Sequence, residues 1–295
     1  MKLTSLVKTA AVILPVTTAP VTAGVFNAPT GLAVDQNSGN LYVANEGSSK
    51  IIVFNDNLIQ QPALTITAGI NQPYTLAIDQ DSIPLVTTTG TLYVGNLSGN
   101  PRQITTYVLG TTTQAPLSFP VTEPVAMAVG ADHVLYEQDV SGPTLNVYNL
   151  VEGTSLIRSL PTGVMFSAIG SDNGLFYYGD GVNINVVSEP KVWSDQSSGG
   201  SKLAGPIGTT FSINFDNFHN AYFTTQSGEI YALTARLALG IMPLLNIANS
   251  TGIAVDKTRN RLFVSVPSKN LVNVYSIVYG TNNVPQSLTL LKTLQ

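Results

Sequence analysis

The stretch PTGLAVDQNSGNLYVANEGSSKIIVF, residues 29–54, returns near the other end of the chain as STGIAVDKTRNRLFVSVPSKNLVNVY, residues 250–275. Each copy has a short apolar run that ends at Asp35 or Asp256, then a polar turn, a run with an aromatic residue and a further apolar run. Self-similarity at a fixed period is the sequence signature of repeat architectures. The two stretches therefore predict that the first and last units of one repeat array share a structure.

Weaker copies lie between these two stretches. In each copy a short apolar run ends at an Asp or Gly, and we call this residue the anchor of the repeat. The anchors are Asp35, Asp79, Gly130, Gly170, Asp216 and Asp256. Successive anchors are 44, 51, 40, 46 and 40 residues apart, close to the period of about 40–50 residues of a four-stranded propeller blade. The spacing predicts an all-β fold, a six-bladed β-propeller with four-stranded antiparallel blades.

The repeats also predict the order of strands inside each blade. Second strands carry Tyr or Phe, as in NLYVAN and TLYVGN, and third strands alternate apolar and polar residues, as in QITTYV and LNVYNL. Such alternation is typical of half-buried strands. Outer strands are expected at ALTIT (residues 63–67) and SLTLLKTL (residues 287–294). The latter would complete blade 6 without a strand from residues 24–28. Residues 233–242 alone show a short helical periodicity.

The motif P-x-G-L-A-V-D, followed by G-N-L-Y-V-A-N and K-I-I-V-F, resembles the NHL repeat of β-propellers. The resemblance covers about residues 27–295 and is clearest in the first and last repeats. It implies the six-bladed fold. It leaves the function open, because such propellers serve as binding platforms, lyases and lactonases.

Composition excludes several classes of function. The 295-residue chain is 44% hydrophobic and 10% charged, which predicts a folded rather than a disordered protein. Its net charge is −4 and its 13 Lys and Arg are scattered, so no basic patch is available for nucleic acid. The sequence after the N-terminal segment has no run of about 18 consecutive apolar residues, so it predicts no membrane span. The absence of cysteine excludes disulfides, thiolate nucleophiles and Cys-ligated zinc.

The N-terminus has the pattern of a secretory signal. Lys2 and Lys8 precede the apolar run 10–16, and Val21-Thr22-Ala23 follows. We predict cleavage after Ala23 and a secreted or periplasmic protein, with residues 24–295 forming a single propeller domain. The alternative is that residues 1–23 form a disordered or strand-forming arm.

Loops that lead into the first strands, and loops that join second to third strands, lie on one face of a propeller, around the mouth of its central channel. This face, termed the loop face, is where ligand binding is expected first. Its candidate binding residues are Asn27, Asn45, Glu46, Asn71, Asn96, Glu123, Glu137, Asp139 and Asp180. The acidic group in residues 123–139, with Asp180 from the next blade, predicts a weak cation site, an acid–base pair or solvated loop charge.

The chain is also similar to gluconolactonase-like six-bladed propellers. That resemblance implies a divalent cation in the channel, held by acidic and amide side chains at the starts of inner strands. The corresponding positions here are Thr30, Tyr74, Val125, Met165, Phe211 and Thr251, and, before each Pro position, Asn27, Asn71, Thr122, Thr162, Gly208 and Ala248. None is a carboxylate, and a hard cation needs several oxygens with compensating negative charge. We therefore predict no metal site and no cofactor.

Four other features have structural interpretations. Asp35 and Asp79 open stretches that are similar to calcium loops but lack the twelfth-position Glu, so we expect Asx turns there. His133 and His219 are expected on the surface of the face opposite the loop face, where they form no Ser-His-Asp triad. Trp193, ahead of a Gly/Ser-rich tract, is expected to pack that loop or to serve as a sugar-stacking platform.

These observations favour a non-catalytic platform that binds a protein or glycan partner through its loop face. Two alternatives remain open. One is a lactonase- or lyase-type hydrolytic enzyme with a site at the central channel. The other is a structural subunit of an extracellular assembly, which would form oligomers.

Overall fold

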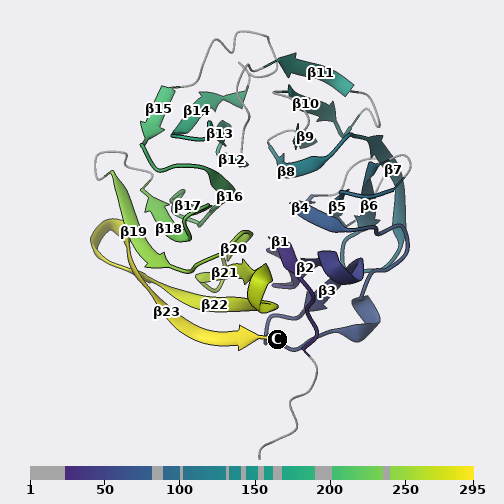
Figure 1. Cartoon of the computed structure of the whole chain (residues 1–295), viewed down its shortest axis with the longest axis horizontal. Helices are drawn as coiled ribbons and strands as arrows, with labels where there is room; N and C mark the ends of the chain where they lie inside the picture. The colour runs from purple at the N-terminus through teal and green to yellow at the C-terminus, as the bar shows by residue number, and fades with distance from the viewer. Residues whose placement is uncertain are drawn as a thin grey trace, which may run out of the picture.

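The computed structural model describes residues 24–81, 89–99, 102–130, 133–140, 144–151, 156–161, 168–189, 201–234 and 240–295. Six antiparallel sheets surround a central opening (Figure 1), and within each sheet the strands follow chain order from the opening outward. This arrangement confirms the six-bladed β-propeller.

The blades follow one another along the chain. Blade 1 contains β1 (Pro29–Val34), β2 (Leu41–Asn45) and β3 (Lys50–Phe54), and blade 2 contains β4 (Pro73–Asp79), β5 (Thr91–Asn96), β6 (Gln103–Val108) and β7 (Gln114–Pro120). Blade 3 contains β8 (Pro124–Val129), β9 (Val134–Asp139), β10 (Thr144–Asn149) and β11 (Leu156–Pro161), and blade 4 contains β12 (Ile169–Asp172), β13 (Leu175–Gly179), β14 (Ile184–Ser188) and β15 (Ser201–Ala204). Blade 5 contains β16 (Thr210–Phe215), β17 (Ala221–Thr225), β18 (Glu229–Leu233) and β19 (Ile241–Asn246), and blade 6 contains β20 (Ile253–Asp256), β21 (Arg261–Val266), β22 (Leu271–Tyr279) and β23 (Pro285–Leu294).

One-turn 3-10 helices punctuate the loops: η1 (Glu46–Ser48), η2 (Pro62–Leu64), η4 (Pro267–Lys269) and η5 (Thr281–Asn283). None of the helices in the described residues is long and apolar enough to span a bilayer.

The hydrophobic core is divided among the interfaces between neighbouring blades. On β2, Val43 packs with residues of blade 6, whereas the adjacent Tyr42 packs with residues of blade 2. Successive side chains of a strand point to opposite faces of its sheet. A strand whose sheet is covered on both faces is therefore apolar at nearly every position, which explains the continuous runs that mark the repeats.

The first and last repeats are neighbours in the ring, and their contact closes it. Phe26, Phe54, Phe263 and Leu294 lie in one buried cluster. Residues 24–28 contribute this Phe26 side chain but no strand, and blade 6 takes its outer strand from β23, as predicted. Closure therefore relies on packing between sheets and not on a strand borrowed from the N-terminal segment.

The glycine at the third position of the motif, in Pro29-Thr30-Gly31 and in Ser250-Thr251-Gly252, lets inner strands approach one another. A Cβ atom on Gly252 would lie 2.1 Å from the carbonyl oxygen of Thr30, and one on Gly31 would lie 2.5 Å from that of Tyr74. Any side chain at these positions would push the neighbouring blade away. The glycine of the motif is thus needed because the inner strands converge on a narrow channel.

Strand register corrects the predicted anchor of blade 4. Tyr177 pairs with Gly170 as Tyr42 pairs with Ala33, so Gly170 corresponds to Ala33 and the anchor is Asp172. The intervals on either side become 42 and 44 residues instead of 40 and 46. The anchors of blades 1 and 2 begin the predicted Asx turns: the Asn37 and Asp81 amides donate to Oδ1 of Asp35 (3.0 Å) and Asp79 (3.1 Å).

The expectation of four strands in every blade is wrong for blade 1. Residues 63–67 do not form a strand: Ile66 makes an isolated bridge with Ile51, and the preceding segment turns into η2 at Pro62. Proline has no N–H to donate to a ladder, so continuous pairing with β3 is interrupted. The segment 233–242, which showed a helical periodicity in the sequence, begins at the end of β18 and ends in β19. Its residues 235–239 lie outside the described part of the chain.

Candidate functional site

The loop face is shaped by buried amides at the ends of second strands. The backbone N–H of Asn27 donates to Oδ1 of Asn45 over 2.6 Å, and that of Asn71 donates to Oδ1 of Asn96 over 2.8 Å. Asn45 and Asn96 are each only 1% exposed. Their side chains hold the loop of their own blade from beneath, while Asn27 and Asn71 lie exposed on the face.

Asp139 occupies the same position in blade 3. Its Oδ1 accepts the backbone N–H groups of Thr122 (3.1 Å) and Glu123 (2.6 Å). The Glu123 carboxylate itself pairs with Arg102 over 2.5 Å, with both side chains about one-third exposed. An exposed pair of this kind contributes little stability, about 0–1 kcal/mol. Asp139 therefore supports the loop, and Glu123 belongs to its surface.

Glu137 lies two residues before Asp139 and is fully buried. Its Oε2 accepts a hydrogen bond from Nδ2 of Asn146 over 2.6 Å, while its Oε1 has no partner among the described residues. Burial raises the pKa of Glu137 to about 8; the Asn146 hydrogen bond opposes this rise and the Asp139 carboxylate adds to it. Glu137 is consequently a neutral acid at neutral pH.

Asp180 in blade 4 is engaged with its own turn. It accepts hydrogen bonds from the amides of Val182 (2.9 Å) and Asn183 (2.6 Å) and from Nδ2 of Asn185 (2.8 Å). Burial acts to raise the pKa of Asp180, but the hydrogen bonds from Asn185, Asn183 and Val182 outweigh it and lower the pKa. The carboxylate therefore stays ionised while ordering the β13–β14 turn.

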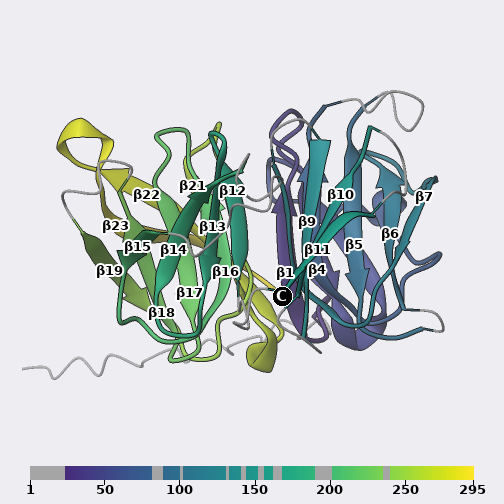
Figure 2. The same ribbon diagram turned by 90° about the horizontal axis from the view of Figure 1, so that it is seen from above.

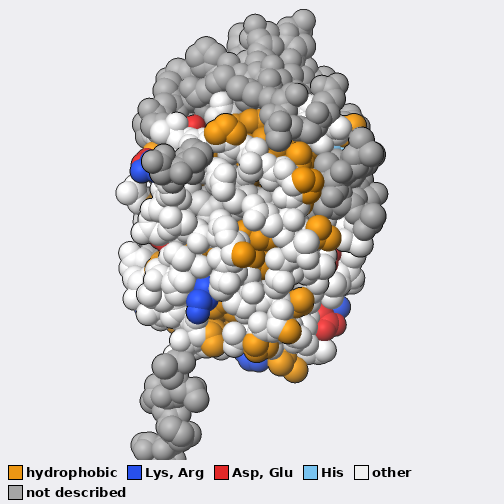
Figure 3. All heavy atoms as spheres, turned by 90° about the vertical axis from the view of Figure 1, so that its right-hand side faces the viewer, with side chains coloured by type: hydrophobic (Ala, Val, Ile, Leu, Met, Phe, Trp, Pro, Cys, Tyr) orange, Lys and Arg blue, Asp and Glu red, His pale blue; other side chains and the backbone are white. Residues whose placement is uncertain are grey.

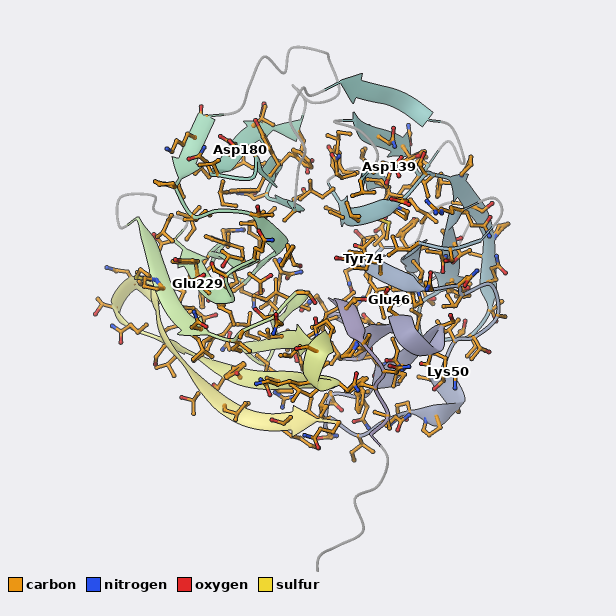
Figure 4. All side chains as sticks on the ribbon, viewed as in Figure 1. Glu46, Lys50, Tyr74, Asp139, Asp180 and Glu229 are labelled. Atoms are coloured by element: carbon orange, nitrogen blue, oxygen red, sulfur yellow. The ribbon has the colours of Figure 1, made fainter. Side chains whose placement is uncertain are left out.

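Glu46 and Tyr74 lie beside one another at the edge of the central opening (Figure 4). Both are half-buried. Burial raises the pKa of Glu46, and burial followed by the Glu46 charge raises the pKa of Tyr74. A carboxyl group and a phenol at the channel mouth offer both acceptor and donor to an incoming polar partner. Tyr74 occupies one of the inner-strand positions at which the sequence shows no carboxylate, and it is not among the predicted binding residues.

The nine predicted binding residues form small groups within their blades. Asn27 meets Asn45, Asn71 meets Asn96, and Glu123 meets Asp139, whereas Asp180 bonds to its own turn and to Asn185 at the start of β14. Glu46, Asp139, Asp180 and Glu229 come from different parts of the ring in Figure 4. Glu229, absent from the predicted set, accepts from Oγ1 of Thr225 over 2.8 Å. A Thr followed four residues later by Glu, at the β17–β18 turn, is the signal that could have identified it.

The central channel contains a cavity of about 200 Å³. Small side chains from successive inner strands form its wall, among them Ala33, Ala77, Ala128 and Gly170. Its polar lining consists of Gln36, Gln80, Ser171, Asn214 and Lys257. No Asp, Glu or His is found in the described part of this lining. The cavity therefore brings no carboxylate–imidazole or carboxylate–carboxylate pair to a bound molecule within the described residues.

Two of these glutamines connect neighbouring blades. Gln36 Nε2 donates to the carbonyl of Val255 over 2.8 Å, and its Oε1 accepts the N–H of Lys257 over 2.8 Å. Gln80 repeats both contacts one blade later, toward the carbonyl of Val34 (3.3 Å) and the N–H of Gln36 (3.0 Å). The glutamine after the anchor thus links each of these blades to the one before it.

The two histidines make a comparable contact on the face opposite the loop face. Nδ1 of His133 lies 2.7 Å from Oδ2 of Asp79, and Nδ1 of His219 lies 2.7 Å from Oδ2 of Asp172. Each histidine follows its own anchor by three residues and reaches the anchor of the preceding blade. Recurrence in two blades supports a role in joining blades.

Within the described residues, no three His, Asp or Glu side chains gather closely enough to hold a metal ion. Trp193, Thr162 and Met165 lie outside the described residues. The side of the disc that includes blade 2 carries scattered hydrophobic side chains and few charged ones outside the grey residues (Figure 3).

Comparison with known proteins agrees with this architecture. The family model of the NHL repeat matches residues 26–54. A chain in the crystal structure of a nidogen/laminin complex has a TM-score of 0.60 and 14% sequence identity, with 77% of this chain and 86% of that chain covered. No curated protein matches the sequence. At this identity the likeness establishes the fold alone. The chain is thus a six-bladed β-propeller whose first blade matches the family model of the NHL repeat.

Proposed function

We propose that this protein is an exported interaction platform that binds a protein or glycan partner through its loop face and catalyses no reaction. The observation that carries the proposal is the ordering of the loops by buried clamps. Asn45, Asn96 and Asp139 hold three successive loops from beneath. A surface already ordered before binding loses less conformational entropy when a partner docks.

The exposed side chains above these clamps would contact the partner. Asn27, Asn71 and Glu123 lie on the surface, and Glu46 and Tyr74 lie at the channel mouth. Their carboxamide, carboxyl and phenol groups supply both donors and acceptors with little net charge. The solved neighbour comes from a nidogen/laminin complex, an assembly of proteins, which supports an interaction role for this fold.

Site-resolved cross-linking tests the proposal. Lys50 begins β3 and Lys269 ends η4, both next to the loop face, whereas Lys202 and Lys292 lie on outer strands. The full-length chain is treated with an amine-reactive cross-linker in the surface and secreted fraction of the producing organism, and in parallel is applied to an array of defined glycans. Cross-links to a partner should concentrate at Lys50 and Lys269.

A matched pair of variants controls the experiment. Asn71→Lys places one positive charge on the loop face, and Thr289→Lys places one on exposed outer strand β23. The first should weaken binding of the captured protein or arrayed glycan by about tenfold or more, and the second should leave it unchanged. Equal effects of the two variants, or cross-links confined to Lys202 and Lys292, would contradict the loop-face assignment.

A melting experiment separates this function from metal-dependent hydrolysis. A ligand that binds only the folded state raises the melting temperature. We expect EDTA, Ca²⁺ and Zn²⁺ to leave the melting temperature of the full-length chain unchanged. A drop with EDTA that a metal reverses would favour the lactonase alternative over the platform.

A further inference from the structure

A second pocket lies on the face opposite the loop face, beside the hairpin of β22 and β23. This hairpin extends past the neighbouring strands (Figure 2). It is tied to blade 5 by three contacts: the rings of Tyr279 and Phe218 lie 5.1 Å apart, Nδ2 of Asn220 donates to the carbonyl of Asn283 over 3.0 Å, and the Tyr279 hydroxyl donates to Asp216 over 3.0 Å. The hairpin therefore forms a fixed wall above the β16–β17 turn.

The space between this wall and the turn is a cavity of about 290 Å³, termed the hairpin pocket. Asn217, Phe218, His219, Thr234, Asn282 and Asn283 line it. A smaller cavity of about 80 Å³ adjoins it and shares His219 and Thr234. The larger volume lies near the low end of the range for small-molecule sites, enough for a compact ligand of one ring.

The hairpin pocket contains polar groups with unused hydrogen-bonding capacity. Thr234 is only 1% exposed, and its buried Oγ1 has no hydrogen-bond partner among the described residues. The carboxamides of Asn282 and Asn283 are exposed and likewise make no side-chain hydrogen bond within the described part of the chain. A buried hydroxyl without a partner is costly, so a ligand that hydrogen-bonds Oγ1 of Thr234, once this side chain turns toward the pocket, would remove that cost.

The described lining carries no Asp, Glu, Lys or Arg. The full charges nearby are already engaged with the protein's own groups. Asp216 accepts hydrogen bonds from the N–H of Phe218 (2.8 Å) and from Nδ2 of Asn220 (2.8 Å). Asp172 lies 3.6 Å from Lys257 and also holds Nδ1 of His219. A cation or a strong anion would therefore lose its hydration without gaining a compensating charge. Neutral amides and a hydroxyl, by contrast, both donate and accept hydrogen bonds.

We propose that the hairpin pocket binds a neutral sugar residue. Sugar hydroxyls are donors and acceptors at once, which matches the carboxamides of Asn282 and Asn283 and the hydroxyl of Thr234. Phe218, 37% exposed, supplies an apolar ring for the C–H face of the sugar, since aromatic side chains combine large apolar area with a rigid shape. This site is independent of the proposed function, because it lies on the opposite face and uses none of the loop-face residues.

Saturation-transfer NMR on the full-length chain tests the site, with maltotriose, cellotriose and tri-N-acetylchitotriose as neutral probes and citrate as an anionic probe. Each is applied at about 10 mM, ten times a Kd of about 1 mM. Asn282→Gly removes one carboxamide but suits the positive φ of 62° at that position. Asn173→Gly is the matched control: it is an exposed asparagine with φ of 51° in the blade 4 turn, outside the hairpin pocket.

At least one neutral trisaccharide should bind, and Asn282→Gly should weaken it by about fivefold, the effect of one lost hydrogen bond. Thr234→Val should weaken it similarly, and Asn173→Gly should have no effect. The proposal is overturned if no neutral probe binds, if citrate binds in their place, or if Asn173→Gly weakens binding as much as Asn282→Gly does.

Discussion

Replacing Glu137 with glutamine should reverse its effect on stability between acid and alkaline pH. The pKa of Glu137 is about 8 in the folded protein against a model value of 4.5. Between these values the folded state holds a proton that the unfolded chain releases, so the stability of the wild type falls as pH rises through that window. Below pH 4.5 both states are protonated and the penalty is absent.

The magnitude follows from the difference between 8 and 4.5. About 3.5 pH units at about 1.36 kcal/mol each give a penalty of roughly 5 kcal/mol above pH 8. Glutamine has no charge to bury, but its amide N–H₂ takes the place of the unpartnered Oε1, which costs about 1–3 kcal/mol at every pH. Glu137→Gln should therefore be about 1–3 kcal/mol less stable than wild type at pH 4 and about 2–4 kcal/mol more stable at pH 9.

Urea unfolding of the full-length chain, followed by far-ultraviolet circular dichroism from pH 4 to pH 9, measures this difference. Other groups titrate in both proteins, so their contributions cancel in the comparison. The neighbours most able to spoil this cancellation are Asp139, whose charge acts on Glu137, and Tyr148, whose pKa is raised by burial and then by the Glu137 charge. Glu123→Gln, on the surface of the same blade, serves as the control and should differ from wild type by less than about 1 kcal/mol. A stability difference between Glu137→Gln and wild type that stays constant from pH 5 to pH 8 would refute the reasoning.

Three further predictions concern the contact between blades 1 and 6. Phe26→Ala should lower the free energy of unfolding by about 3–5 kcal/mol, because Phe26 is 4% exposed in the cluster that closes the ring; a loss below about 1 kcal/mol in urea unfolding would show that this side chain is dispensable. Gly252→Ala should lower the melting temperature more than Gly110→Ala, since the added methyl group meets the Thr30 carbonyl in the first case, whereas in the second it meets nothing within 4 Å and costs only the backbone strain of alanine at a φ of 76°; equal losses would contradict the close approach of the strands. Gln36→Leu should speed hydrogen exchange at the Lys257 amide, which donates to Oε1 of Gln36, and unchanged protection there would mean that the side chain does not hold the blades together.

The repeat pattern predicted the ring and its six blades because strand alternation and turn residues are local properties. The repeat pattern failed where strand pairing, and not sequence, decides which residues of two blades are equivalent. Blade 4 has Gly-Ser-Asp at residues 170–172, and the sequence motif alone placed the anchor at Gly170; pairing with Tyr177 shows that Asp172 is the equivalent residue. It also failed at residues 63–67, a run that suits a strand by composition, because Pro62 just before it begins η2 and interrupts the ladder.

The site was harder to predict because burial sets the role of each polar residue. Asn45 and Asn27 are the same residue type only 18 positions apart, yet the first lies under the loop and the second on it. Glu137 occupies in blade 3 the position that Val43 occupies in blade 1. Nothing in the sequence around Glu137 distinguishes a buried acid from a solvated one. The contacts of His133 with Asp79 and of His219 with Asp172 join residues 54 and 47 positions apart, a separation that spacing along the chain does not reveal.

The cluster at the blade 1–blade 6 interface joins residues 26–54 to residues 254–294, and this separation affects how the chain is made. A ribosome adds about 5–20 residues per second, so about 10–40 seconds pass between the synthesis of Phe54 and that of Ala254. Throughout this interval the blade 6 side of blade 1, with Phe26, Val43 and Phe54, lacks the blade 6 residues that cover it in the folded protein. Apolar surface exposed during synthesis favours aggregation. Because the two halves of this interface lie at opposite ends of the chain, the apolar surface of blade 1 must be kept from aggregating until blade 6 has been synthesised.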